Sequence, residues 1–427
     1  MAPEAVRKRR RWRWRSLFLL LAVLGPGFIT ASAGNDVGGI TTYSQAGAHF
    51  GYRILWVLIP LALALIVVQE MATRMGAVTG KGLAALIREN FGVRVSFFAM
   101  AALFAINLVI TATEFAGIAA ASEIFHISRF VAVPVAMLIV LILVFGFNSK
   151  SIDRAFVCFS LIYFCYIASA ILAHPNWGAV AHGAVVPAFD FNNRAYLVMV
   201  VGLIGTTISP YMQFFLQSAV VEKGSDEREL TLARADVISG SILAIAIAGF
   251  MIIANAATIF TANRHGAHIA PLQAADYAAA LRPLAGEAAS IIFALGIFNA
   301  GLFTATVLPL STSYVICEAF GFEAALDRKF HEAPVFFTLF AIGLIAGGAL
   351  VLIPHLPLLN LIFYAQVAQG ILLPPELILM LMIVNKRGVM GRHTNGWFGN
   401  TVAWATVALV GALSIYYAVT QVFGGTA

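Results

Sequence analysis

Long apolar runs recur from residue 17 to residue 421, and they limit the folds that this chain can adopt. Each run is long enough for a helix of about 20 residues, which is the length that crosses a bilayer. Because 61% of the residues are hydrophobic and only 11% are charged, an ordinary water-soluble domain is excluded. In lipid only helices and closed barrels satisfy the backbone polar groups, and runs of this length fit helices. We therefore predict an all-α polytopic membrane protein whose eleven spans cover 17–50 (broken), 54–76, 95–122, 130–148, 155–173, 195–221 (broken), 235–260, 287–317, 334–354, 358–384 and 397–421.

The lysines and arginines predict how these spans are oriented. If the N-terminus is cytoplasmic, 21 of the 26 basic residues fall in cytoplasmic segments and five fall outside. Such an asymmetry follows the rule that positive residues stay inside, and an odd number of spans then places the C-terminus in the extracellular or periplasmic space. The protein is expected in the cell inner or plasma membrane.

The N-terminal tail, residues 1–15, carries seven of these basic residues, interleaved with Trp12 and Trp14. An apolar span follows directly, which favours a cytoplasmic anchor at the membrane interface over an arm that binds nucleic acid. No segment between the spans is long enough for a soluble domain. Residues 16–427 are therefore interpreted as a single integral-membrane domain, expected to be monomeric in the bilayer.

Two of the spans are interrupted at matching positions. The first contains the stretch 34–39, Gly-Asn-Asp-Val-Gly-Gly, which places the ionisable Asp36 at bilayer depth. The sixth contains 205–210, where Pro210 removes a backbone donor and disfavours helical geometry at Ser209. Broken helices five spans apart predict an inverted five-plus-five repeat with its site at the midplane. The repeats are expected at about 16–173 and 190–384, followed by an extra helix at 397–421; two ordinary kinks are the alternative.

The chain contains no sequence motif of an enzyme or of an ATP-driven pump. No nucleophile–base motif, Walker sequence or histidine cluster is present. An acid inside the membrane is a functional-site hypothesis by default, because it costs several kcal/mol to place there. We therefore predict a transporter rather than an enzyme, and expect no cofactor.

Several motifs resemble those of one transporter family. Residues 25–28 (Gly-Pro-Gly-Phe), Asp36 and residues 45–56 (QAGAHFGYRILW) resemble the first-helix signature GPGF…DPGN…AGAQFGY…LW of the Nramp divalent-metal transporters. Residues 78–83 (VTGKGL) and 364–367 (YAQV) resemble the family's VTG-[RK]-x-L connector and the SQV of its tenth helix. The resemblance covers about residues 17–420. It implies a LeuT-type fold that carries divalent cations by alternating access.

The resemblance also implies which residues line the cation site. Asp36 matches the family aspartate, but Val37 and Gly39 stand where the family has Pro and Asn. On the sixth span, Thr206 and Ser209 stand where the family presents an Ala carbonyl and a Met thioether. The remaining expected contacts are the carbonyl of Gly205, the amide of Gln366, which matches the family's tenth-helix glutamine, and the amide of Asn35, which would replace the missing one.

These departures favour a harder cation. A thioether suits late transition metals, whereas carboxylate, hydroxyl, carbonyl and water suit Mg²⁺, Ca²⁺ and Mn²⁺. Ser209 in place of the family's Met removes the soft ligand, and Gly39 in place of its Asn is expected to enlarge the cavity. Mg²⁺ keeps several waters and binds through one or two carboxylates, so a roomy pocket with one acid predicts a hydrated Mg²⁺. If Asn35 replaces the lost amide, the site instead remains an ordinary Nramp site.

The proton route of the family is also altered. Family members place two acids on the third helix and a histidine on the sixth; here Glu114 keeps one acid, Gly117 replaces the other, and Tyr211 replaces the histidine. A tyrosine is a poor proton carrier at neutral pH. These positions resemble the Nramp-related magnesium transporters, a branch that carries Mg²⁺ and Mn²⁺ without proton coupling.

The sequence therefore predicts import of Mg²⁺, and also Mn²⁺, without proton coupling. The alternatives are a proton-coupled Mn²⁺/Fe²⁺ symporter of the ordinary Nramp kind and an amino-acid or amine transporter on the same fold. The predicted partners are divalent metal cations and the lipid bilayer, and no nucleic acid. Four polar residues within the spans receive no assigned role: Glu70, Asn255, Asn299 and Glu376.

Overall fold

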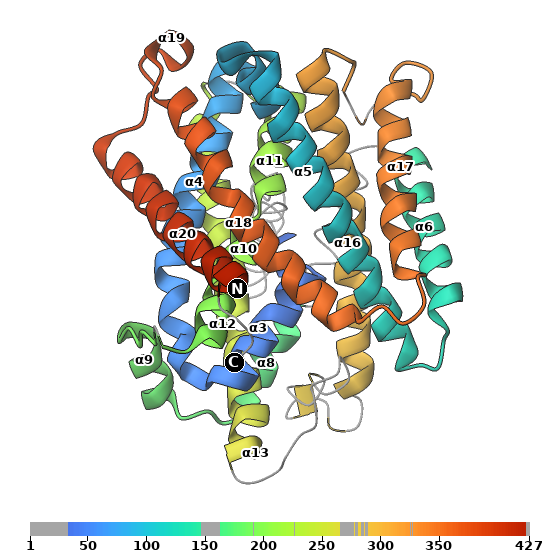
Figure 1. Cartoon of the computed structure of the whole chain (residues 1–427), viewed down its shortest axis with the longest axis vertical. Helices are drawn as coiled ribbons and strands as arrows, with labels where there is room; N and C mark the ends of the chain where they lie inside the picture. The colour runs from blue at the N-terminus through green and yellow to red at the C-terminus, as the bar shows by residue number, and fades with distance from the viewer. Residues whose placement is uncertain are drawn as a thin grey trace, which may run out of the picture.

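The computed structural model describes residues 33–146, 163–190, 192–225, 227–264, 277, 281–282, 286, 289–324, 326 and 328–423. Every regular element longer than one residue in these ranges is helical, in agreement with the predicted class (Figure 1). The elements, with η for 3₁₀ turns and for the π-turn η4, are η1 (Ala33–Asn35), α3 (Val37–Phe50), η2 (Gly51–Val57), α4 (Leu58–Thr79), α5 (Leu83–Glu123), α6 (Arg129–Gly146), α8 (Phe164–Leu172), α9 (Trp177–Val185), α10 (Arg194–Thr207), α11 (Pro210–Glu222), α12 (Leu230–Asn255), η4 (Ala256–Phe260), α13 (Thr261–Arg264), α16 (Ala289–Phe320), α17 (Pro334–Val351), α18 (Leu358–Val384), α19 (Arg387–Met390) and α20 (Trp397–Phe423).

The described helices reproduce the predicted spans. Nine helical runs in the described part of the chain are long and apolar enough to cross a membrane. One of them, Val37–Thr79, contains both the second half of the first predicted span and the whole second span. Helix α8 is the described part of the fifth span, so that all eleven predicted spans have a helical counterpart. The tail 1–15 and the first half of the first span, 17–32, lie outside the described residues.

A short connector is expected at 77–92, between the second and third predicted spans, and the structure contains one. The backbone of α5 is not helical at Gly92, so residues 83–91 form a short helix that is separate from the span after it. Gly92 has a φ of 81°, a conformation that a side chain would strain. The loop expected at 174–194 contains a helix, α9, which begins after Asn176 caps it through a hydrogen bond from Ala179 N at 3.1 Å.

The two predicted breaks are present. In the first, the turn η1 ends at Asn35, Asp36 is extended, and α3 begins at Val37. In the second, α10 ends at Thr207 and α11 begins at Pro210, whose fixed φ and missing N–H suit the first position of a helix. Helix α3 packs against α10, α12 and α18, and α5 packs against α16, α17 and α18, which brings both breaks into the middle of the bundle (Figure 1).

The outer faces of the helices are apolar. On α6 the exposed side chains include Phe130, Val131, Val135, Leu138 and Ile142. Because this helix is long enough to cross a membrane, its exposed face is the face that contacts lipid. The buried polar side chains lie inside the bundle, and several of them find no protein partner.

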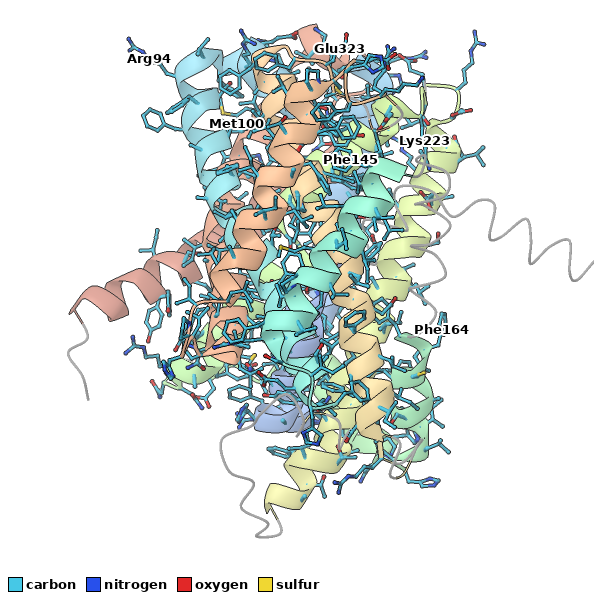
Figure 2. All side chains as sticks on the ribbon, turned by 90° about the vertical axis from the view of Figure 1, so that its right-hand side faces the viewer. Arg94, Met100, Phe145, Phe164, Lys223 and Glu323 are labelled. Carbon is cyan, nitrogen blue, oxygen red and sulfur yellow. The ribbon has the colours of Figure 1, made fainter. Side chains whose placement is uncertain are left out.

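Described residues from three of the segments predicted to be cytoplasmic share one end of the molecule. Arg94, Lys223 and Glu323 lie at this end, far from α9 and α13 at the other (Figures 1 and 2). At the first end, Gln217 Nε2 donates to the carbonyl of Lys81 at 2.8 Å. This contact ties α11 to the connection between α4 and α5.

Glu70 belongs to this end rather than to the centre. Its carboxylate pairs with Arg74 at 3.0 Å and with Arg234 at 2.7 Å. Nearby, Glu227 accepts hydrogen bonds from Arg392 and from His393, each at 3.2 Å, and these bonds lower the pKa of the Glu227 carboxyl. Glu70 and Glu227 are therefore both matched by basic residues.

Candidate functional site

Asp36 occupies the N-cap position of α3. Its backbone is extended, with φ −65° and ψ −174°, and its Oδ1 accepts a hydrogen bond from Gly39 N at 2.5 Å. An aspartate is a favoured N-cap, because it satisfies one of the backbone donors that the first turn leaves free. Its other oxygen, Oδ2, is buried and has no hydrogen-bond partner in the described protein. That oxygen is free to contact a cation.

The glycines around Asp36 permit close backbone contacts. A Cβ at Gly39 would overlap the carbonyl oxygen of Gly34 and would lie 3.4 Å from Asp36 Oδ1. The space released by the missing asparagine is therefore taken by backbone in this conformation, which does not show the larger cavity expected at Gly39. Asn35 donates a long hydrogen bond from Nδ2 to Ala244 O at 3.4 Å, and its Oδ1 has no partner among the described residues.

The second break supplies oxygens on the facing wall. A Cβ at Gly34 would lie 3.5 Å from the carbonyl oxygen of Thr206, so the two breaks are in contact. The hydroxyl of Thr206 is buried, and no hydrogen bond to it is made by the described protein. Ser209 Oγ donates to the carbonyl of Gly205 at 2.8 Å and approaches that of Thr206 at 3.3 Å. Its proton is used within its own segment, while its oxygen keeps acceptor capacity.

Met212 is a neighbour of the site that the sequence interpretation missed. A Cβ at Gly34 would lie 3.2 Å from Met212 Cε, and Met212 is fully buried. It follows Ser209 by three residues, so it lies about one helical turn further along α11. The thioether lost at Ser209 thus has a counterpart beside the first break. The only signal was a methionine one turn from an expected ligand.

Gln366 approaches from α18. A Cβ at Gly38 would overlap the Gln366 side-chain amide and would lie 3.1 Å from Asp36 Oδ1. Both amide atoms of Gln366 are buried and lack hydrogen-bond partners in the part of the chain that is described. Gly38 therefore provides the space that lets this amide reach the first break, as the sequence predicted for Gln366.

Helices α10 and α18 meet through their backbones. A Cβ at Gly205 would overlap the carbonyl oxygen of Gln366 and lie 2.5 Å from Gly370 N. A Cβ at Gly370 would in turn lie 2.7 Å from the carbonyl oxygen of Val201. The structure gives Gly205 a packing role in addition to the carbonyl expected of it, and that carbonyl already accepts from Ser209.

The altered proton-route positions contact Val37. Glu114 Oε2 accepts a hydrogen bond from Val37 N at 3.2 Å, and Oε1 has no partner among the described groups. A Cβ at Gly117 would lie 2.6 Å from Val37 Cγ2, so the valine fills the space above that glycine. Tyr211 is fully buried and its carbonyl accepts from Ser311 Oγ at 3.2 Å.

Two further hydrogen bonds hold α3 in place. Tyr43 Oη and Thr207 Oγ1 are 2.9 Å apart and join α3 to the end of α10. Asn255 Nδ2 donates to Ser44 Oγ at 3.2 Å and to Met251 O at 2.8 Å, which makes it a helix–helix contact.

The site is therefore a small buried region with two acids, Asp36 at the first break and Glu114 behind Val37, and several neutral oxygens. All ten predicted site residues, including Glu114, Gly117 and Tyr211, are buried. No group of three or more His, Cys, Asp and Glu side chains that could hold a metal is found among the described residues. At the break itself the chemistry is that of the Asp36 carboxylate with hydroxyl, amide and carbonyl oxygens and one nearby thioether, and the Glu114 carboxyl lies behind it; this set suits a weakly and reversibly held cation.

Comparison with known proteins gives a consistent result. Residues 27–420 match the family described as natural resistance-associated macrophage protein-like, or Nramp. The chain is 28% identical to the divalent metal cation transporter MntH of Ralstonia nicotianae over 437 aligned positions, which cover 95% of this chain and 92% of that protein.

Solved structures show the same fold. The manganese transporter of Eremococcus coleocola, crystallised with an aromatic bis-isothiourea substituted compound, superposes with a TM-score of 0.73 at 22% identity, covering 96% of this chain and 89% of that one. MhsT in complex with L-phenylalanine superposes with a TM-score of 0.62 at 16% identity, covering 92% and 98%. The predicted fold class is confirmed by these similarities.

Proposed function

We propose that this chain, which belongs to the Nramp family, imports Mg²⁺ and also Mn²⁺. Import occurs by alternating access and without proton coupling in this proposal. The chain is a multi-pass membrane transporter for divalent metal cations and not an enzyme. The relatives are named as transporters of divalent metal and of manganese.

The observation that carries the proposal is the free oxygen of Asp36. It lies at the first helix break, against the facing break at Thr206, and no group of the described protein neutralises it. A buried carboxylate without a partner is costly, and a cation would supply the missing charge. Thr206, Ser209, Gln366 and Asn35 add neutral oxygens, and Gly39 and Gly205 allow the backbones to approach.

The neighbouring donor set supports a hard ion. Carboxylate, hydroxyl and amide oxygens are ligands that Mg²⁺ and Mn²⁺ accept. Ser209 contributes an oxygen where the family presents sulfur, which favours Mg²⁺. Met212 places a thioether near Gly34, and this favours retaining Mn²⁺ as a second substrate.

The lack of proton coupling is inferred from three positions. Gly117 and Tyr211 replace titratable groups, and the retained Glu114 hydrogen-bonds to the backbone N–H of Val37. No coupling ion is required for uptake, because an inside-negative potential favours a divalent cation by about 4.6 kcal/mol per 100 mV. The remaining acid pair, Asp36 and Glu114, is the feature that keeps the proton-coupled Mn²⁺/Fe²⁺ symporter as the second candidate.

We place the end that carries Arg94 and Lys223 in the cytoplasm. Most of the basic residues that the structure describes belong to segments predicted to lie at that end, in line with the rule for membrane orientation. Residues 16–427 form the single transport domain of a monomer in this proposal. An amino acid or amine would place its own charged groups at the first break, and the carboxylate of Asp36 disfavours an amino-acid substrate there.

The test is uptake into proteoliposomes that contain a pH-sensitive dye. Mg²⁺ and Mn²⁺ should enter under an inside-negative potential without acidifying the lumen, and excess Mg²⁺ should compete with Mn²⁺. Acidification driven by the metal would refute the uncoupled mechanism, and failure of Mg²⁺ to compete would refute the magnesium assignment.

The role of Asp36 is tested separately. Asp36→Ala should abolish uptake, because it removes the carboxylate at the first break, whose Oδ2 has no partner in the described protein. Asp190→Ala, which removes an acid near Arg53 on the other end, should leave uptake unchanged. Wild-type uptake by Asp36→Ala would remove this residue from the site.

A further inference from the structure

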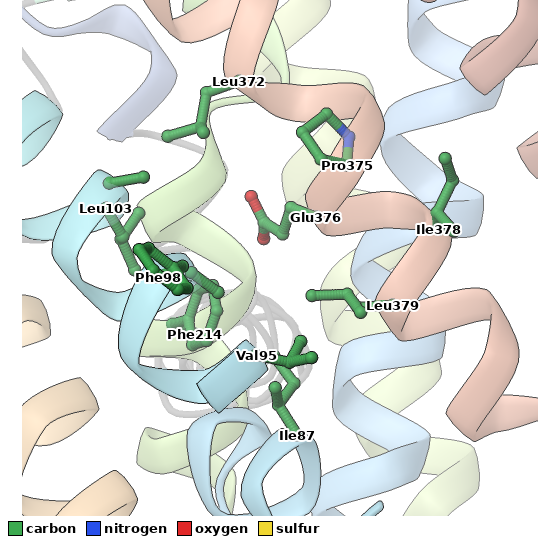
Figure 3. A pocket seen from close by; sticks show the side chains of 12 residues that line it. Ile87, Val95, Phe98, Leu103, Phe214, Leu372, Pro375, Glu376, Ile378 and Leu379 are labelled. Atoms are coloured by element: carbon green, nitrogen blue, oxygen red, sulfur yellow. The ribbon is translucent and has the colours of Figure 1, made fainter. Parts of the chain in front are cut away.

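A second cavity lies away from the candidate cation site. It has a volume of about 550 Å³ and lies between the first turns of α5 after its kink, the later half of α18, and α11 (Figure 3). Its walls are apolar, and they include Leu103, Phe214, Leu372 and Leu379. A space of this size can enclose a small organic molecule.

Glu376 is the only charged or polar side chain among the residues that line this cavity. It is 7% exposed, and neither of its carboxylate oxygens has a hydrogen-bond partner within the described structure. Figure 3 shows the carboxylate directed away from α18 into the space that faces α5 and α11. A buried carboxyl group without a partner in an apolar cavity is costly, so such a group requires a reason.

The cavity is accessible from the lipid-facing side of the bundle. Phe98 and Val95 line it and are 72% and 39% exposed, on a helix that is long enough to cross the membrane. Arg94 marks this as the end that the proposed orientation places in the cytoplasm (Figure 2). A molecule that partitions into the inner leaflet could therefore reach Glu376.

The lining determines which class of ligand fits. A divalent metal needs several oxygen ligands, and Glu376 is the only side chain of the lining that offers any. A neutral apolar molecule would leave both carboxylate oxygens unsatisfied. A protonated amine or amidine with an apolar body would pair with the Glu376 carboxylate and would also pack against the apolar walls. The rings of Phe98 and Phe214 add a favourable surface for a cation.

We propose that this cavity is a binding site for hydrophobic organic cations. The charged nitrogen pairs with Glu376 and the apolar body occupies the space between α5 and α18. The three helices around it also carry Glu114, Gln366 and Met212, so an occupant between them would hinder their relative motion and inhibit uptake. Only this inhibition rests on the proposed transport function, because binding can be measured without it.

The test compares two fluorescent probes of the same shape, 1-naphthylmethylamine and 1-naphthylmethanol, on the full chain in nanodiscs. The amine should bind saturably and the alcohol at least about tenfold more weakly, because only the amine forms a charged hydrogen bond. Glu376→Gln should weaken binding of the amine by at least about tenfold and leave the alcohol unchanged. Glu323→Gln, which alters an exposed acid at the same end, is the matched control and should change neither.

A second variant keeps the proposal testable if Glu376→Gln fails to fold. Ala99→Phe fills the cavity from α5 and should weaken both probes. In proteoliposomes the amine should inhibit metal uptake by the native protein, and the inhibition constant should rise in both variants. Equal binding of amine and alcohol, or unchanged amine binding in Glu376→Gln, would overturn the proposal. Binding without inhibition would overturn only its link to transport.

Discussion

The hydrogen bond between Val37 N and Glu114 Oε2 can be removed by one substitution that leaves the backbone almost undisturbed. Proline at position 37 lacks the N–H group, and position 37 is the first residue of α3, where proline is well tolerated. Proline also requires an extended residue before it, and Asp36 is already extended, with ψ −174°. Val37→Pro therefore removes the donor without disturbing the backbone, and it also exchanges the two valine methyl groups above Gly117 for the proline ring.

The expected cost follows from what is left behind. Glu114 Oε1 has no partner in the described protein, so losing the bond to Oε2 leaves both oxygens of a fully buried carboxyl group unsatisfied. An unsatisfied buried acceptor costs about 1–3 kcal/mol. Val37→Pro should lower the free energy of unfolding by that amount.

The assay is a double-mutant cycle on unfolding by SDS in mixed micelles. In the Glu114→Ala background there is no carboxyl group to leave unpaired, so the loss caused by Val37→Pro should be smaller there by about 1–3 kcal/mol. The matched control is Val37→Ala, which keeps the N–H and removes two methyl groups. It should cost roughly 1.5 kcal/mol in both backgrounds.

Equal losses for Val37→Pro with and without the Glu114 carboxyl group would refute the reasoning. That result would mean that the ring of proline, or the lost valine methyl groups, accounts for the effect. Equal coupling for Val37→Pro and Val37→Ala would refute it as well, since only the first variant lacks the donor.

Three further results are expected. Gly117→Ala should lower the free energy of unfolding by about 1–2 kcal/mol in thermal or SDS unfolding, because the added Cβ overlaps Val37. Val37→Ala should restore part of this loss, and a double variant as unstable as Gly117→Ala alone would contradict the contact. Met212→Leu should lower the preference for Mn²⁺ over Mg²⁺ by about tenfold in competitive uptake, and Ser209→Met should shift it the other way; unchanged preferences in both would exclude sulfur from the site. The pKa of Glu227 is lowered in the folded protein, so its pairing with the loop after α19 is complete above pH 4.5 and is lost as the pH falls through the lower folded-state pKa. Hydrogen exchange in residues 391–396 should therefore rise only in acid, and Glu227→Gln should abolish this change.

The helical spans and their two breaks could be predicted, because they follow from the spacing of residue types along the chain. Apolar runs of the length of a bilayer predicted the spans, and Pro210 and the glycines around Asp36 predicted both breaks. Broken helices in equivalent repeats meet at the midplane, so the contact between Gly34 and Thr206 also followed from the sequence.

The features that depend on side-chain contacts were not predictable. Gly117 was interpreted as a lost acid, but nothing in the sequence shows that Val37, eighty residues earlier, fills the space above it. The loss of sulfur at Ser209 was visible, whereas the approach of Met212 to Gly34 depends on how two helices pack. A larger cavity at Gly39 was expected from residue size, and the backbone of Gly34 occupies that space in this conformation.

The backbone contact between α10 and α18 determines where the site can hinge. Gly205 and Gly370 leave no side chain between the two helices that could change rotamer and let them separate. We expect this backbone contact to hold Thr206 on one helix and Gln366 on the other at a fixed separation. Opening around the cation would then come from the facing segment, where Asp36 has an extended backbone at the start of α3. In that case Asn35 and Asp36 move during transport, whereas Thr206 and Gln366 stay in place.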